Sequence, residues 1–276
     1  MKIGAIIVNY NDSKRIVLLV NKLLAYSVFS DIVIVDNVSN EEDINNLKNQ
    51  LTQYQVHILI NETNVGFNQA TTNGLKLLSD MKNDYAFSIN SDIEVSKETI
   101  IAHVSFLEEH NDYGAVSCKM IEGGKEKQMY YQFPTIGSEV RNDLGINKLF
   151  HIKPKIRKKH DGYIDIDFAR SSFLCLRMEA MEKIDYFDGG TFLYFGEAIL
   201  GIKLKKLGYK EACLLNYKYY HNHIYKKGYK MNGYKATYKD SLYLFNRYYR
   251  VSKFGFFRLK TAYKIGILIR KVFRIS

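Results

Sequence analysis

Four short apolar runs in the first ninety residues constrain the fold more than any other feature of this sequence. Each run has the length of a buried strand; they cover residues 2–8, 32–35, 56–60 and 85–89. Stretches in which apolar residues recur at helical spacing separate the runs. Strands joined through helices pair in parallel with right-handed crossovers, because a tight turn cannot join adjacent parallel strands. The sequence therefore predicts an α/β fold with a mixed, mostly parallel sheet flanked by helices.

Polar residues follow these runs at the points where the predicted strands end. They are Asn9, Tyr10 and Asn11 after the first run, Asp36 and Asn37 after the second, and Asn90, Ser91 and Asp92 after the fourth. The carboxyl ends of parallel strands share one edge of the sheet, and ligands bind there in open α/β folds. Each turn alone could serve only to cap the next helix, but three on one edge favour a ligand site. We interpret Asp92 as an anchor for a metal and a diphosphate.

The remaining elements continue the pattern with one interruption. Ser39 and Glu42 have capping-box spacing for the second helix. A helix capped by Ser96 precedes a strand at 114–120, an extended segment spans 165–177, and a helix over 198–207 ends at Gly208. Residues 121–163 have weak periodicity, so we expect long loops there that form a lid or an acceptor site.

Length and composition exclude several classes of protein. The chain has 276 residues, and no apolar run approaches the roughly 18 residues that span a bilayer. The start of the chain does not resemble a signal peptide. Cys118, Cys175 and Cys213 are far apart and lack a C-x-x-C pair, so neither a disulfide framework nor a zinc site is indicated. We expect a cytoplasmic protein.

The positive charge is concentrated at the C-terminus. Residues 203–276 contain 19 Lys and Arg residues against Glu211 and Asp240, a net charge of +17, which leaves −6 for residues 1–202 and +11 overall. Such a segment indicates an anionic partner, either nucleic acid or the inner leaflet of a membrane. Nucleic acid is disfavoured because no recognised nucleic-acid module is present.

A helix predicted over 255–275 makes the membrane the favoured partner. On a helical wheel, Lys260, Lys264, Lys271 and Arg274 lie on one side, opposite Leu259, Ala262, Ile265, Ile269, Val272 and Phe273. This pattern is typical of a basic amphipathic helix that lies on an anionic membrane surface, which predicts peripheral attachment to the inner face of the cell membrane. The alternative is a helix packed on the domain with a solvated basic face.

The ordered motifs resemble the family 2 glycosyltransferases with the GT-A fold, especially the bacterial rhamnosyltransferase-like members. The resemblance covers about residues 2–215. It rests on Ile7-Val8-Asn9-Tyr10-Asn11, Val35-Asp36-Asn37-Val38-Ser39, Asn64-Val65-Gly66-Phe67, Asn90-Ser91-Asp92, Phe187-Asp188-Gly189, Phe192-Leu193-Tyr194 and Leu207-Gly208-Tyr209. It implies a glycosyltransferase domain over 1–215, with a nucleotide-binding half to residue 95 and an acceptor-binding half from 96. Residues 216–276 would form a Tyr-rich, basic, helical extension.

The resemblance also implies roles for individual residues. Asp36 would hydrogen-bond the pyrimidine ring of a UDP- or dTDP-sugar. Asp92 would bind a divalent cation, Mg²⁺ or Mn²⁺, that bridges the two phosphates. His221 is the best match for a histidine that reaches the metal or the diphosphate, and His223 is the second; either could instead be structural. The other expected donor contacts are Asn9, Tyr10, Asn11, Asn37, Asn64, Gly66, Asn68, Asn90 and Ser91.

Two positions depart from the family pattern. The diphosphate motif commonly has two acids, whereas the first is Asn90 here, which predicts weaker metal binding. The base motif is usually Glu-Asp, and this chain has Gly196-Glu197-Ala198. Counting back from Gly208 places Glu197 on the acid that acts as catalytic base, and a helix N-terminus keeps such a carboxylate ionised. The alternative is that Glu197 only begins the helix.

These inferences predict an inverting glycosyltransferase. It would move a sugar from a UDP- or dTDP-sugar to a hydroxyl group of a lipid-linked or growing cell-surface polysaccharide. The alternative is a catalytically weak protein that binds sugar nucleotides or acts as a scaffold, since one acid of each motif is missing. The sequence does not determine the oligomeric state.

Overall fold

The computed structural model describes residues 1–127, 132–150, 158–223 and 230–272. One mixed sheet forms its centre, with the strand order β3-β2-β1-β4-β10-β6-β11-β9-β8; β5 pairs with β11 and β7 with β6. The strands are β1 Ile3–Asn9, β2 Asp31–Asp36, β3 Val56–Ile60, β4 Tyr85–Ile89, β5 Ile93–Glu94, β6 Tyr113–Glu122, β7 Lys125–Lys127, β8 Lys158–Lys159, β9 Tyr163–Ile166, β10 Phe173–Arg177 and β11 Lys210–His221. The helices are α1 Ser13–Ala25, α2 Glu41–Gln50, α3 Gly66–Asp80, α4 Lys97–Glu109, α5 Ile136–Asp143, α6 Ile146–Leu149, α7 Met178–Lys183, α8 Gly196–Lys206, α9 Lys230–Tyr248 and α10 Lys253–Val272.

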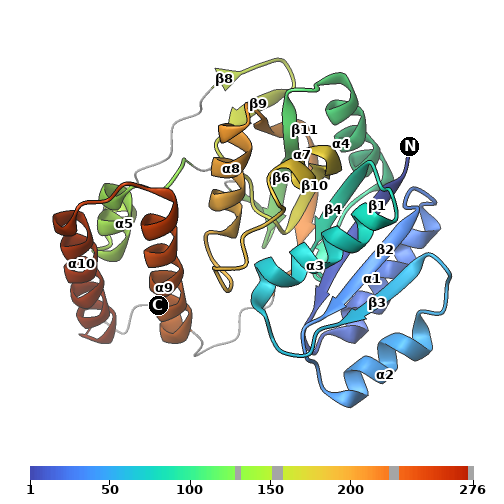
Figure 1. Ribbon diagram of the computed structural model, residues 1–276, viewed down its shortest axis with the longest axis horizontal. Helices are drawn as coiled ribbons and strands as arrows, with labels where there is room; N and C mark the ends of the chain where they lie inside the picture. The colour runs from blue at the N-terminus through green and yellow to red at the C-terminus, as the bar shows by residue number, and fades with distance from the viewer. Residues whose placement is uncertain (128–131, 151–157, 224–229, 273–276) are drawn as a thin grey trace.

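The N-terminal half of the sheet has the predicted parallel arrangement (Figure 1). Strands β3, β2, β1 and β4 are neighbours and all run in the same direction. Asn9 pairs with Asp36 in the register of β1 and β2, so the polar turns that follow these strands lie side by side. The predicted alignment of polar turns along one edge is therefore confirmed for these two strands.

The second half of the sheet mixes strand directions. Strand β10 is antiparallel to both β4 and β6, whereas β11 is parallel to β6. The short strand β5 pairs antiparallel with the end of β11, where His221 is opposite Ile93. This pairing places the end of β11 next to the turn that carries Asp92.

Two local expectations were wrong. Asn40, not Ser39, caps α2, and its side chain accepts a hydrogen bond from the backbone N–H of Asp43. The Ser39 hydroxyl instead accepts hydrogen bonds from the Asn9 amide and from the backbone of Asn11. Residues 121–163 are not only loops, because they contain β7, α5, α6 and β8. Periodicity missed these elements because each has eight residues or fewer.

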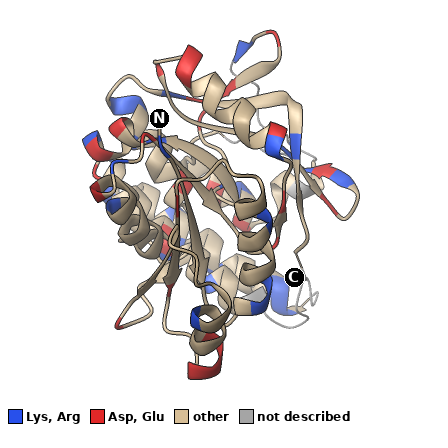
Figure 2. Cartoon of the chain, turned by 90° about the vertical axis from the view of Figure 1, so that its right-hand side faces the viewer, with Lys and Arg blue, Asp and Glu red and all other residues tan. Residues whose placement is uncertain are grey.

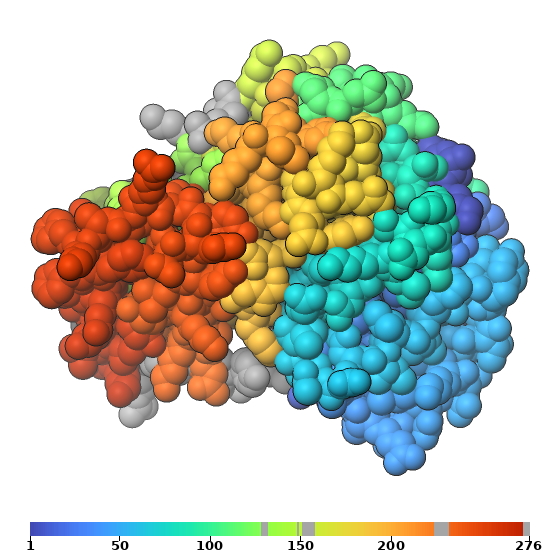
Figure 3. Space-filling model, in the orientation of Figure 1, coloured from blue at the N-terminus to red at the C-terminus, as the bar shows by residue number. Residues whose placement is uncertain are grey.

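The C-terminal helices form a lobe together with α5 (Figures 1 and 3). Helix α10 packs against α5, and the rings of Tyr238 and Tyr263 stack between α9 and α10 with centroids 3.7 Å apart. Helix α9 contacts α8. The predicted boundary at residue 215 falls inside β11, which continues to His221. Among the described residues, no helix is long and apolar enough to cross a membrane.

Candidate active site

An acid and two histidines gather where β5 meets β11. The Nε2 atom of His221 lies 3.2 Å from Oδ1 of Asp92, and Nδ1 of His223 lies 3.2 Å from Oδ2. One ligand atom from each of the three residues lies within 4.8 Å of the others. The structure thus brings together Asp92 and both candidate histidines, which are about 130 residues apart in sequence.

The donor chemistry of this cluster fits a divalent cation. Both ring nitrogens of His221 are buried and each faces a carboxylate oxygen, Nε2 that of Asp92 at 3.2 Å and Nδ1 that of Glu122 at 3.5 Å. Carboxylate oxygen suits Mg²⁺, Ca²⁺ and Mn²⁺, and imidazole nitrogen suits transition metals such as Zn²⁺ and Fe²⁺, so this mixed set of ligands fits a divalent cation.

The Asp92 carboxylate is strongly held in its ionised form. Burial opposes ionisation, but the two imidazoles beside it outweigh burial and lower the pKa of Asp92 to about 2. Asp92 is therefore anionic across the physiological pH range.

Glu197 lies at the start of α8, as the sequence predicted. Its Oε1 atom accepts hydrogen bonds from the Ser171 hydroxyl at 2.8 Å and from the Ser171 backbone N–H at 3.2 Å. The residue before the helix, Phe195, has a left-handed backbone with φ of 62°. This sharp turn lets α8 begin directly at the site, with Glu197 in its first turn.

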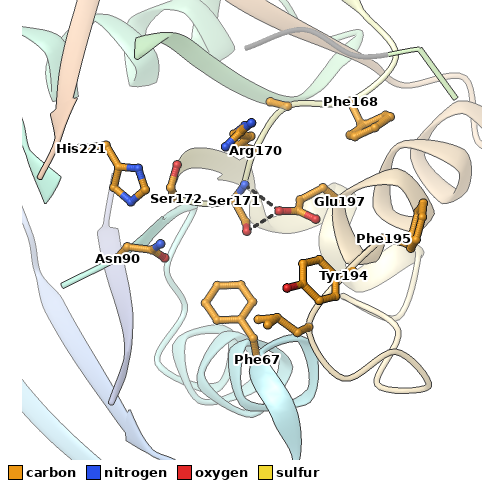
Figure 4. Close-up of a pocket in the computed structure, with 12 residues that line it drawn as sticks. Phe67, Asn90, Phe168, Arg170, Ser171, Ser172, Tyr194, Phe195, Glu197 and His221 are labelled. Atoms are coloured by element: carbon orange, nitrogen blue, oxygen red, sulfur yellow. Dashed lines mark hydrogen bonds between the residues drawn. The ribbon is translucent and has the colours of Figure 1, made fainter. Parts of the chain in front are cut away.

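One pocket of about 470 Å³ joins these groups (Figure 4). Glu197 and Tyr194 lie on one side of it, and His221 and Asn90 lie on the opposite side. Ser171 and Ser172 lie between the two sides. A carboxylate and the edge of the histidine cluster thus face the same space, which is the arrangement needed to deprotonate one substrate beside a bound anionic group of another.

A cation at this pocket was missed by the sequence analysis. Arg170 also lines the pocket and belongs to the loop between β9 and β10. The sequence signal was present in Ala169-Arg170-Ser171-Ser172, a short polar interruption inside an otherwise extended apolar segment.

Glu211 of β11 hydrogen-bonds the loop between β9 and β10. Its Oε2 atom accepts a hydrogen bond from the backbone N–H of Ala169 at 3.0 Å, two residues before the partner of Glu197. Burial, and then the nearby negative charges of Glu197 and Asp167, raise the pKa of Glu211 well above its ordinary value. Glu211 therefore positions the loop that holds Glu197.

The C-terminal extension contributes a second positioning acid, Asp240 of α9. Its buried carboxylate accepts hydrogen bonds from three successive backbone N–H groups, of Phe192 at 3.2 Å, Leu193 at 3.0 Å and Tyr194 at 2.9 Å. The sequence analysis missed this role. The signal was available, because Asp240 is the only acidic residue after Glu211.

The first two polar turns form a continuous hydrogen-bonded network. The Asn9 amide donates to Asp36 at 2.7 Å, to Asp43 at 2.7 Å and to Ser39 at 3.1 Å. The other oxygen of Asp36 accepts from the backbone N–H of Ser39 at 2.9 Å. Asp36 was expected to bind a pyrimidine ring. In this structure it is fully buried and both of its carboxylate oxygens accept hydrogen bonds inside the turns, so it holds the turns together and does not face solvent. The exposed parts of the turns are Tyr10, Asn11 and Val38.

Asn37 connects these turns to the start of α3. Its side chain donates to Asn64 at 2.9 Å and accepts from the backbone N–H of Val65 at 3.0 Å. Gly66 follows with φ of +80°, and a Cβ there would lie 2.5 Å from the carbonyl oxygen of Phe192. Asn37, Asn64 and Gly66 therefore join the first two polar turns to the loop that precedes α8.

Asn68 explains the glycine in the base motif. A Cβ at Gly196 would lie 2.0 Å from Oδ1 of Asn68, and the amide of Asn68 donates to the Thr191 hydroxyl at 2.8 Å. The resemblance places an acid at position 196, and the buried Asn68 occupies the space that its side chain would need.

The third polar turn is held at both ends. The backbone N–H of Asn90 donates to the Ser172 carbonyl at 3.0 Å, and the Ser91 hydroxyl donates to the Asp12 carboxylate. The Asp92 carbonyl accepts from the backbone N–H of Asn222 at 2.9 Å. The turn that carries Asp92 is thereby tied to the turn after β1, to the loop between β9 and β10, and to the residue that follows β11.

Comparison with known proteins assigns the chain to a family. Residues 5–185 match the model for glycosyl transferase family 2. The chain belongs to this family. The match to the family model covers the parallel half of the sheet, Asp92 and the loop of Ser171. Glu197 and the two histidines lie beyond the end of the match.

Individual relatives of this family 2 chain are distant. It is 22% identical over 196 residues to the low-salt glycan biosynthesis hexosyltransferase Agl10 of Haloferax volcanii, a match that covers 71% of this chain and 59% of that protein. The chain thus spans about three-fifths of the length of this curated relative.

Solved structures show the same GT-A fold. GalNAc-T7, solved with UDP, GalNAc and Mn²⁺, aligns with a TM-score of 0.65 and 15% identity over 89% of this chain and 48% of its own. The mannosyltransferase PcManGT of Pyrobaculum calidifontis, solved with GDP-Man and Mn²⁺, aligns with a TM-score of 0.62 and 11% sequence identity. The match covers 98% of this chain and 75% of that protein's chain. TarS residues 1–349 of S. aureus, solved with UDP-GlcNAc, align with a TM-score of 0.58 and 17% sequence identity. The match covers 91% of this chain and 68% of the TarS chain. The fold expectation is therefore confirmed.

Proposed function

We propose that this chain transfers a sugar from a nucleoside diphosphate sugar to an acceptor hydroxyl by a single inverting displacement. The observation that carries the proposal is the shared pocket of about 470 Å³, in which Glu197 lies on the side opposite Asn90 and His221. Glu197 takes the proton of the acceptor hydroxyl. The acceptor oxygen then bonds to the anomeric carbon, and the bond from that carbon to the diphosphate breaks with its electrons on the departing nucleotide.

The remaining groups stabilise the departing diphosphate. Asp92, His221 and His223 would hold a divalent cation, for which we propose Mn²⁺ over Mg²⁺ from the two imidazoles. Such an ion, when bound, acts as a Lewis acid on the leaving group. Arg170 lines the same pocket and supplies a further positive charge toward the phosphates.

Recognition of the nucleoside is assigned to the first two polar turns. The network of Asn9 and Asp36 holds these turns in place, and Tyr10 and Asn11 present exposed groups to the base. We propose a UDP- or dTDP-sugar donor and a hexosyl or rhamnosyl transfer. For the acceptor we propose a lipid-linked or growing surface polysaccharide, an assignment supported by the glycan biosynthesis role in the name of the Haloferax relative.

A nucleotide-release screen tests this function. UDP-, dTDP- and GDP-sugars are incubated with the full chain and either Mn²⁺ or Mg²⁺. The released nucleoside diphosphate is measured with and without saccharide acceptors. We expect release from a UDP- or dTDP-sugar that is faster with Mn²⁺. Donor binding without release under any condition would instead identify a sugar-nucleotide-binding or scaffold protein.

A further inference from the structure

Helix α10 has two apolar faces, and the protein uses only one of them. Leu259, Ala262 and Gly266 are buried on the side of α10 that packs against α5. The helical wheel had placed Leu259 and Ala262 on the free apolar side, which was wrong because these residues belong to the protein interior. The packing alternative raised by the sequence is thus correct for this face.

A second apolar stripe runs along the solvent side of the same helix. Its members have exposed fractions from 41% to 73% and recur at three- to four-residue spacing; they are Phe254, Phe257, Ile265, Leu268 and Val272. Thr261, also exposed, occupies the intermediate position. Five large apolar side chains thus lie along one side of the helix, with one break at Thr261, unlike apolar residues scattered singly over a surface.

Positive charge borders this stripe. The exposed basic residues of α10 are Lys253, Arg258, Lys260, Lys264 and Lys271. Residues 241–276 contain no acidic residue. On the opposite side of the molecule, by contrast, acidic and basic residues intermingle (Figure 2). The apolar stripe of α10 is therefore bordered by charge of a single sign.

We propose that this stripe, Phe254 to Val272, is a docking surface for an anionic lipid bilayer. The apolar side chains would enter the boundary between headgroups and acyl chains while the flanking cations contact anionic headgroups. A second copy of the chain fits the stripe poorly, because its stripe would carry the same positive borders into the interface.

The docking surface is connected to the catalytic pocket. Helix α10 stacks on α9 through Tyr263 and Tyr238, and α9 carries Asp240, which holds the backbone of Tyr194 at the pocket wall. The bilayer would thus bind the same lobe that holds the Tyr194 side of the pocket in place. Membrane binding itself does not depend on the proposed function, but its benefit for a lipid-linked acceptor rests on that function.

Vesicle co-sedimentation of the full chain tests the docking surface. Vesicles of phosphatidylcholine with about 30 mol% phosphatidylglycerol are compared with phosphatidylcholine alone. We expect binding to the anionic vesicles, weakened at least tenfold in Phe257→Ser/Leu268→Ser. Lys260→Gln/Lys264→Gln should weaken it by roughly fivefold for each lysine removed.

Matched variants elsewhere on the chain control for general effects. Leu18→Ser removes an exposed leucine from α1, and Lys14→Gln/Lys48→Gln removes two exposed lysines from α1 and α2. Both should bind vesicles like the wild type. Equal pelleting of Phe257→Ser/Leu268→Ser and the wild type would overturn the proposal, as would absence of wild-type binding.

Two further measurements separate the remaining possibilities. A concentration-dependent dimer in analytical ultracentrifugation that disappears in Phe257→Ser/Leu268→Ser, without vesicle binding by the wild type, would assign the stripe to a second copy and overturn the bilayer. Release of nucleotide from a donor sugar in solution should be unchanged in this variant. Vesicle binding by a chain that releases no nucleotide would leave the docking surface supported and reject the proposed activity.

Discussion

The carboxylate of Asp240 lies 2.9 Å from the backbone nitrogen of Tyr194 and accepts its hydrogen bond. It accepts two more from the preceding residues, so one buried side chain of α9 fixes the loop that leads into Glu197. The basic C-terminal extension is thereby part of the active-site architecture.

Asp240→Asn should lower kcat by at least tenfold with a smaller effect on the KM for the donor. The amide keeps one acceptor oxygen but loses the charge, and a hydrogen bond to a charged group contributes about 1.5–3 kcal/mol. Steady-state kinetics measure the split between kcat and KM. Asp80→Asn, at an exposed position of α3, is the control and should match the wild type. A purely structural Asp240 would lower the melting temperature and leave the kcat of the folded fraction unchanged.

Glu197→Gln should abolish transfer while preserving donor affinity. Removing a general base costs roughly 10²- to 10⁴-fold in rate, and the amide can still accept the hydrogen bonds of Ser171. Calorimetric titration with nucleotide sugar and a turnover assay measure the two effects. Glu109→Gln, exposed on α4, controls for the loss of one acid. Wild-type turnover in Glu197→Gln would remove Glu197 from the mechanism.

Replacement of His223 tests the metal cluster with a readout that is independent of activity. His223→Ala should weaken Mn²⁺ binding by about 10- to 100-fold, a range typical of changes around metal sites, whereas Mg²⁺ binding should change less because it depends mainly on Asp92. Titration of the ion, followed by electron paramagnetic resonance for Mn²⁺, gives the affinities. His110→Ala, on a histidine outside this cluster, is the comparison. Equal Mn²⁺ affinity in His223→Ala and the wild type would show that His223 is not a ligand of the ion.

The stability of the protein should fall as pH rises through the titration range of Glu139 on α5. Burial of Glu139 on α5, and then the charge of Asp143, raise its pKa from 4.5 to about 7. The folded chain therefore keeps a proton that the unfolded chain releases near pH 4.5, so stability falls between pH 4.5 and 7 and stays lower above pH 7. Part of this side chain is solvent-accessible, so we expect a penalty of about 1–2 kcal/mol.

Glu139→Gln should accordingly stabilise the protein at pH 8 and have little effect at pH 5. Denaturant unfolding at the two pH values measures the difference. Glu109→Gln, at an exposed position of α4, should show no such pH dependence. A stabilisation that is the same at both pH values would mean that ionisation of Glu139 is not its cause.

Much of the fold could be predicted because its signals are local. The runs at 56–60 and 85–89 are strands with those bounds, and Ser96 caps α4. Short elements were missed, because a helix such as α6 spans only four residues and shows no period. The cap of α2 was assigned to Ser39 because spacing alone cannot show that a distant Asn11 already uses its hydroxyl.

The sequence by itself determined the longer strands and helices, that the polar turns follow strand ends, and that positive charge gathers at the C-terminus. These properties depend on neighbouring residues and on the fixed periods of the backbone. Only the tertiary structure decided which distant residues meet. The pairing of β5 with β11 brings His221 to Asp92, and the packing of α5 selects which side of α10 remains exposed. The reason is physical: periodicity records that a face is apolar, whereas the partner that covers it is set by contacts between segments far apart in the chain.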